Sequence, residues 1–174
     1  QVDITDSLPA SAGLTKALKV TCTTAEGSVP SGSATSGEAV GIGHYFEKSD
    51  LHQLGVGSSS MSTSILSFYV KSSIATTFGL SISAAQHSTE QKIKIPFTVS
   101  SANTYERISI TIPTYNVALD SDDDNTIGWR IFFVLDAVAS SETNSAWTSS
   151  SDQGVILPKD VNTTGFSNTL NATF

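Results

Sequence analysis

The feature that most constrains the fold of this chain is a strict alternation of apolar and polar residues in several short stretches. In the stretch ERISITIP, every second residue from 108 to 112 is isoleucine, and the residues between them are polar. Successive side chains of a β-strand point to opposite faces, so this period of two predicts strands with one apolar face. Three triplets are expected to meet in the core: Leu66, Phe68 and Val70; Ile108, Ile110 and Ile112; Ile131, Phe133 and Leu135.

Eight stretches of the chain are expected to be strands, because each combines β-forming residues with Ser-, Thr-, Asn- or Gly-rich connections on either side. They span residues 16–22, 37–47, 65–73, 78–83, 91–101, 106–113, 127–136 and 154–158. Pro96 lies inside one of them and predicts an edge or a bulge there. One helical turn is expected over residues 47–55, capped by Ser49 or Asp50 and ended by Gly55.

This pattern predicts an all-β chain of roughly eight strands, folded as an antiparallel β-sandwich. Residues 1–174 are expected to form a single domain, since no repeat or internal boundary is visible. Two stretches rich in Ser, Gly and Thr, residues 23–38 and 140–154, are expected to be long loops. The chain begins with Gln1, so we expect it to be a fragment of a longer polypeptide.

The composition favours exposed strands and excludes several classes of partner. Charged residues make up only 14% of the chain, and 29 serines and 21 threonines take their place. The formal net charge is −7 and no cluster of Lys or Arg occurs, which argues against a nucleic-acid partner. No apolar stretch is long enough for membrane insertion, and no signal peptide is visible. The single cysteine, Cys22, alternates with Leu18 and Val20 and is expected in the core.

An acidic cluster occupies residues 120–125, directly before the apolar strand IGWRIFFVLD. Asp and Asn favour tight turns, because their short side chains bond to nearby backbone and tolerate positive φ. The cluster does not fit an EF-hand, since its sixth position is Asn125 and its twelfth is Ile131. We therefore interpret it as a turn between strands. The alternative is a calcium site with Asp120, Asp122 and Asp124 as ligands; no other cofactor is expected.

Aromatic residues raise the question of a glycan site, because sugars stack on exposed rings framed by polar side chains. Trp147 lies in a polar stretch expected to be a loop, and Tyr69 and Arg130 lie on the polar faces of their strands. These three residues are the candidates for glycan binding, with Tyr105 and Tyr115 as further exposed rings. The same polar faces are equally suited to cover a second layer or to contact another subunit. Trp129 alternates with core residues and is expected to be buried.

No catalytic residue can be assigned from the sequence. The chain has no GxSxG, no phosphate-binding loop, no dinucleotide fingerprint and no HxH or HExxH pair. We therefore expect a protein that is not an enzyme.

The order of several motifs resembles a known family. ALKVTCTTAEGS, ILSFYVKSS, IPFTVSSANTYERISITIP, GWRIFFVLDA and NSAWTSSSDQG follow one another along the chain. This order is similar to a jelly-roll module found in structural proteins of tailed phages, especially marine ones, which in turn resembles carbohydrate-binding modules. The resemblance extends from about Leu18 to Phe174, with Tyr69 and Tyr105 where the family commonly has Trp. Members usually continue into a further strand after the segment that ends here at Phe174. Three alternatives follow for this closing strand: it is absent, it is supplied by another segment, or it is removed by processing.

The resemblance implies a jelly roll located in the virion, in a tail fibre or another appendage. Other virion proteins are then the expected partners, together with further copies of the chain in a homo-oligomer and a glycan of the host cell surface. Two alternatives remain open: a capsid decoration or head-fibre protein, and a glycan-binding module attached to a secreted hydrolase. The family supplies no catalytic residue and no binding residue for this chain.

Overall fold

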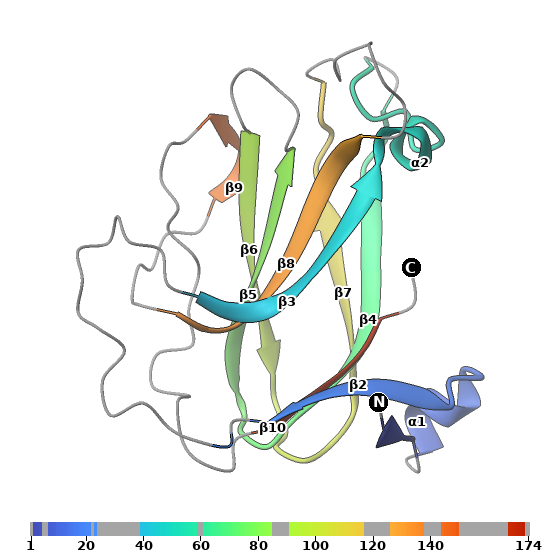
Figure 1. Ribbon diagram of the computed structural model, residues 1–174, viewed down its shortest axis with the longest axis vertical. Helices are drawn as coiled ribbons and strands as arrows, with labels where there is room; N and C mark the ends of the chain where they lie inside the picture. The colour runs from blue at the N-terminus through green and yellow to red at the C-terminus, as the bar shows by residue number, and fades with distance from the viewer. Residues whose placement is uncertain are drawn as a thin grey trace.

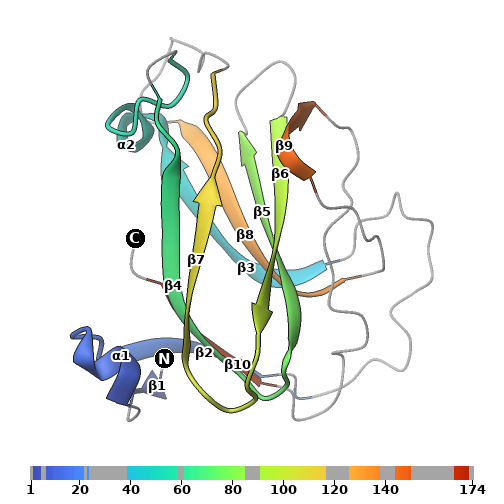
Figure 2. The same cartoon turned by 180° about the vertical axis from the view of Figure 1, so that it is seen from behind.

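A computed structural model describes residues 2–4, 7–21, 23, 39–58, 61–84, 91–116, 126–137, 144–149 and 167–172. These residues form two five-stranded sheets, in which every strand pair is antiparallel. The sheets face each other as two layers (Figures 1 and 2). The prediction of an all-β antiparallel sandwich is confirmed, with ten strands in the described residues rather than eight.

The first sheet has the strand order β1-β2-β10-β4-β7 and the second β3-β8-β5-β6-β9. The bounds in the first sheet are β1 Val2–Asp3, β2 Lys16–Thr21, β10 Ser167–Ala172, β4 Ser64–Ser72 and β7 Glu106–Ile112. Those in the second are β3 Ala39–Glu47, β8 Ile127–Ala137, β5 Thr76–Ala84, β6 Gln91–Val99 and β9 Asn144–Ser149. The two short helices are α1, Ser7–Ser11, and α2, Lys48–His52.

Four of the strand pairs are nested within one another along the chain. The hairpin of β5 with β6 is innermost, and around it β4 pairs with β7, β3 with β8, and β2 with β10. Strands β2, β3 and β4, which precede the hairpin, therefore pair with β10, β8 and β7, which follow it, in reverse order. A long two-stranded ribbon rolled into two layers has this pairing.

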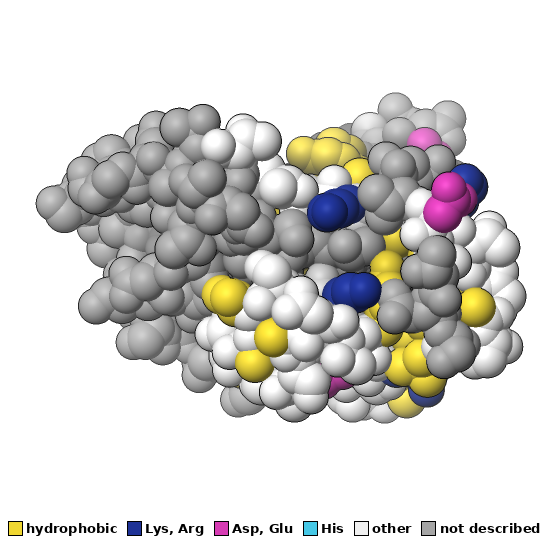
Figure 3. All heavy atoms as spheres, turned by 90° about the horizontal axis from the view of Figure 1, so that it is seen from below, with side chains coloured by type: hydrophobic (Ala, Val, Ile, Leu, Met, Phe, Trp, Pro, Cys, Tyr) yellow, Lys and Arg dark blue, Asp and Glu magenta, His cyan; other side chains and the backbone are white. Residues whose placement is uncertain are grey.

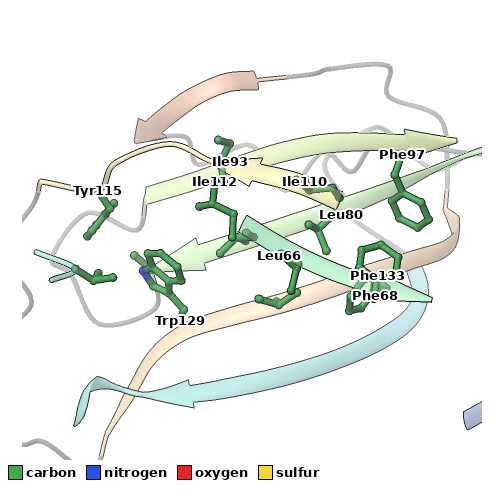
Figure 4. Close-up of a cluster of buried hydrophobic side chains, with 14 of the residues drawn as sticks. Leu66, Phe68, Leu80, Ile93, Phe97, Ile110, Ile112, Tyr115, Trp129 and Phe133 are labelled. Atoms are coloured by element: carbon green, nitrogen blue, oxygen red, sulfur yellow. The ribbon is translucent and has the colours of Figure 1, made fainter. Parts of the chain in front are cut away.

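The apolar side chains of the alternating strands point into the space between the two sheets. In the first sheet Leu66 lies opposite Ile110 and Phe68 opposite Ile108, and the second sheet contributes Phe133 from β8. Phe68 packs edge to face against Phe97 and Phe133, with ring centroids 5.2 and 5.0 Å apart. Figure 4 shows these three rings at one end of the core and Tyr115 and Trp129 at the other. Of the nine residues in the three predicted triplets, all are buried except Ile108, which is half-buried.

Local predictions around the strands are partly confirmed. Pro96 lies in β6 opposite Gly79, beyond the stretch of β6 that β9 pairs with, which places it at an edge as expected. The helical turn is present as α2, but its N-cap is Glu47 rather than Ser49 or Asp50. The Glu47 side chain makes no capping hydrogen bond. The first N–H of the helix, that of Lys48, instead donates to the carbonyl of Thr126 at 3.0 Å.

One expectation near the end of the chain is wrong. The stretch expected as a loop around Trp147 contains strand β9, which pairs with β6. Near the end of the chain, β10 pairs with β2 on one side and β4 on the other. The absence of a further strand after Phe174 stays a prediction. The expected strand at 154–158, Cys22 and most of the loop at 23–38 lie outside the described residues. None of the described helices has the length and apolar character needed to cross a membrane.

Candidate functional site

The three residues predicted to bind a glycan lie on three different parts of the sandwich. Tyr69 is on β4, between core residues Phe68 and Val70, and therefore faces outward from the first sheet. Arg130 is on β8, between Trp129 and Ile131, and faces outward from the second sheet. Because the two sheets pack through their other faces, Tyr69 and Arg130 are on opposite sides of the molecule. One site cannot use both.

Trp147 is a packing residue rather than an exposed ring in a loop. Its Nε1 donates a hydrogen bond to the carbonyl oxygen of Pro113 at 3.1 Å. Its ring centroid lies 4.8 Å from that of Tyr115 and 5.4 Å from that of Trp129. The hydrogen bond and the contact with Tyr115 connect β9 to the segment that follows β7, and the contact with Trp129 connects β9 to β8. Trp147 thus helps to close the side of the sandwich, and its only polar atom is already used within the fold.

Two further rings proposed as exposed are buried. Tyr115 is 1% exposed and belongs to the core next to Trp129, which is buried as predicted. Tyr105 is also buried, with the Nζ of Lys71 lying 5.3 Å from its ring centroid. Neither ring can stack on a sugar in this structure.

The surroundings of Tyr69 form a polar outer face on the first sheet. Its cross-strand neighbour on β7 is the exposed Arg107, and the Nη2 of Arg107 donates to the Oγ of Ser67 at 3.1 Å. Tyr69 itself is half-buried. The face offers a phenol, a guanidinium group and hydroxyls arranged on a regular sheet surface.

The surroundings of Arg130 form a second surface, on the outer face of the other sheet. The strand registers place Tyr45 of β3 opposite Arg130, and Arg130 opposite Ser83 of β5. Tyr45 is 55% exposed, and it is the one aromatic ring among the large exposed hydrophobic residues of the described chain. An exposed ring next to a guanidinium group combines an apolar stacking surface with several hydrogen-bond donors.

The Phe132 ring adds an apolar surface beside Tyr45 and Arg130. A Cβ at Gly41 would lie 2.6 Å from the Phe132 Cζ, and one at Gly43 would lie 3.5 Å from its Cδ2. The ring therefore lies across two glycines of β3, where larger residues would displace it. We call the surface made by Tyr45, Gly43, Arg130 and Phe132 the Arg130 patch.

The same outer face carries more positive charge than the chain as a whole. Lys92 lies opposite Ser83 and so is in line with Arg130 across the sheet, and Lys94 lies opposite Ser81 and so is in line with Phe132. With Arg130 they make three of the nine Lys and Arg residues of a chain with net charge −7. Lys92 and Lys94 are only 4% and 2% exposed, so the accessible part of this charge is at the Arg130 end.

Tyr45 was missed by sequence reasoning, although a signal was present. In GIGHYFE the core side of the strand is marked by Ile42 and Phe46, so the alternation assigns Tyr45 to the outer face. Its neighbour Arg130 could not be assigned to it, because the pairing of β3 with β8 joins segments more than eighty residues apart.

The calcium candidates Asp120, Asp122 and Asp124 lie outside the residues that the structure describes. In the described part of the chain, no group of three or more His, Cys, Asp or Glu residues is arranged to hold a metal ion. Charged groups on the surface seen in Figure 3 are few and scattered among uncharged polar and hydrophobic side chains. In comparisons with known proteins, the chain matches no protein-family model, no curated protein and no solved structure.

Proposed function

We propose that the chain is a non-enzymatic structural module of a tailed-phage virion, located in a tail fibre or another appendage. The observation that carries this proposal is the nested pairing of β2 with β10, β3 with β8, β4 with β7 and β5 with β6. This pairing supports the jelly-roll subclass, which is frequent in capsid and lectin domains. The order of sequence motifs, which resembles phage virion modules, is the second support.

The packing of the interior supports a role without catalysis. The space between the sheets is filled by aliphatic and aromatic side chains, including Phe68, Phe97 and Phe133. The described polar groups that could meet a ligand lie on the outer faces of the sheets instead. A surface of this kind suits adhesion to a host surface or assembly with other virion proteins better than bond-making, which needs a pocket that excludes water.

The test is quantitative mass spectrometry of purified phage particles from a lysate in which the chain is produced. We expect its peptides in the particles, in a fixed ratio to those of the major capsid protein. A chain that stays in the soluble fraction and is absent from particles would contradict the proposal. Immunogold labelling of the particles then distinguishes the two locations. Label on the tail supports a tail fibre or appendage, and label on the head supports a capsid decoration or head-fibre protein.

A second candidate function is glycan binding, either within a fibre or as a module attached to a secreted hydrolase. The Arg130 patch favours it: the exposed Tyr45 ring offers a stacking face, and Arg130 beside it offers donors to sugar hydroxyls or carboxylates. The patch replaces the original trio of Trp147, Tyr69 and Arg130, of which only Arg130 remains.

A glycan array with and without calcium tests this function, followed by variants on the two faces. Tyr45→Ala and Arg130→Gln should each weaken binding of a captured glycan by about tenfold or more, since each removes a direct contact. Tyr69→Ala and Arg107→Gln, on the opposite face, are matched controls and should bind as the wild type does. Loss of binding in the control variants instead would move the site to the first sheet, and no binding at millimolar sugar would remove the function.

A further inference from the structure

The four edges of the two sheets differ in how well they are protected against pairing with another strand. β1 is only two residues long, and β3 and β9 both show irregular register with their neighbours. β7 differs from these three, because it pairs with β4 over seven consecutive residues with no shift in register. Short strands and bulges are the features that usually block edge-to-edge association, and β7 has neither.

The sequence of β7 carries charged, protective residues only at its first two positions, Glu106 and Arg107. Its seven residues, ERISITI, include no proline, glycine or lysine, and five of them are β-branched or serine. Among the described strands it pairs with β4 alone, so the backbone groups on its other side face no described strand. Figure 2 shows β7 at the side of its sheet, beyond β4. Backbone donors and acceptors in a row form a template for one further strand.

We propose that β7 is a dimerisation edge, and that its occupant is β7 of a second copy of this chain in antiparallel orientation. A second copy fits because the centre of the strand, Ile108-Ser109-Ile110, reads the same in both directions. When the two copies overlap over the whole strand, Ser109 lies opposite Ser109, Ile108 opposite Ile110, and Arg107 opposite Thr111. A two-fold interface requires such self-complementarity, because the same patch occurs on both sides.

Burial and charge both suit this register. Ile110 is buried within one copy, whereas Ile108 is half-buried and gains a cover from Ile110 of the second copy. On the outer face the exposed Arg107 meets a neutral threonine, so no like charges oppose each other. The carboxylate of Glu106 accepts a hydrogen bond from the Ser101 N–H at 2.6 Å and so is directed back to its own chain. The first sheet of one copy and the first sheet of the other then form one continuous sheet in the dimer.

The experiment is sedimentation analysis of the full chain over a concentration series. Wild type should form a species of twice the 18.2 kDa of one chain, with a dissociation constant in about the micromolar range. Ser109→Lys should raise that constant at least about tenfold, because it sets two ammonium groups directly opposite each other. Ser62→Lys, an equally exposed serine that precedes β4, is the control and should dimerise as wild type does.

A mixture of two variants tests the register itself. Ser109→Lys and Ser109→Glu should each be monomeric, and mixing them should restore a dimer, because residue 109 faces its own counterpart only in this pairing. Circular dichroism of each variant checks that the sandwich is intact. The proposal is overturned if wild type remains a single chain at about 100 µM, if Ser109→Lys dimerises as well as Ser62→Lys, or if the mixture stays monomeric.

Discussion

Removing the indole ring of Trp147 gives a quantitative test of how the side of the sandwich is closed. Truncation of a fully buried tryptophan to alanine costs about 3–5 kcal/mol. Trp147 is only half-buried, so we take about 2–3 kcal/mol for its contacts with Tyr115 and Trp129. The lost hydrogen bond to the Pro113 carbonyl adds about 1 kcal/mol. Trp147→Ala should therefore lower the free energy of unfolding by about 3–4 kcal/mol and Tm by about 10 °C.

Urea unfolding followed by circular dichroism measures this change without depending on tryptophan fluorescence. Trp147→Phe separates the two contributions, since it keeps a ring against Tyr115 but loses the hydrogen bond, and it should cost about 1–2 kcal/mol. Tyr45→Ala, which removes a 55% exposed ring, should change stability by no more than about 0.5 kcal/mol. If Trp147→Ala were as mild as Tyr45→Ala, Trp147 would not be part of the packing, and its role as a glycan ligand would be open again.

Three glycine substitutions probe how closely the strands approach their neighbours, and all three are measured by urea unfolding. Gly41→Ala should lower the free energy of unfolding by about 1–3 kcal/mol, because its Cβ would lie 2.3 Å from the backbone oxygen of Phe133. Gly43→Ala should lower it by less than about 1 kcal/mol, since the atom nearest to its Cβ, the Phe132 Cδ2, would be 3.5 Å away. Gly128→Ala should also cost about 1–3 kcal/mol, because its Cβ would lie 2.5 Å from the Leu51 Cδ1 and 3.2 Å from α2 backbone. Equal stabilities of Gly41→Ala and Gly43→Ala would mean that β3 and β8 are not packed as described.

The alternation of residues was enough to predict strands β2 to β8 and most of their buried faces, whereas β1, β9 and β10 were not predicted. Successive side chains of one strand point to opposite faces, so whether Phe68 or Tyr69 faces the core depends only on local sequence. The alternation of apolar and polar residues is therefore enough to predict it. The burial of Trp129 follows from the same reasoning. The pairing partners of the strands could not be predicted in this way. Strand β10 pairs with β2 and β4, which lie far from it in the sequence, and nothing local in SNTLNA indicates those contacts.

The candidate site was predicted less well because it depends on contacts between distant segments. Trp147 looked exposed in a polar stretch, but its surroundings are supplied by Pro113 and Tyr115, more than thirty residues earlier. Tyr69 and Arg130 were both correctly expected on outward faces. Their separation depends on which sheet each strand joins, and that assignment is set by the whole nested pairing. Tyr45 could be placed next to Arg130 only once β3 was seen beside β8.

The proposal that this sandwich is a virion module is tested most directly by cryo-electron microscopy of purified particles that contain the chain. We expect density for two packed five-stranded sheets in a tail fibre or appendage, with copies joined through β7. Complete, well-resolved particles in which no density fits the sandwich would contradict it.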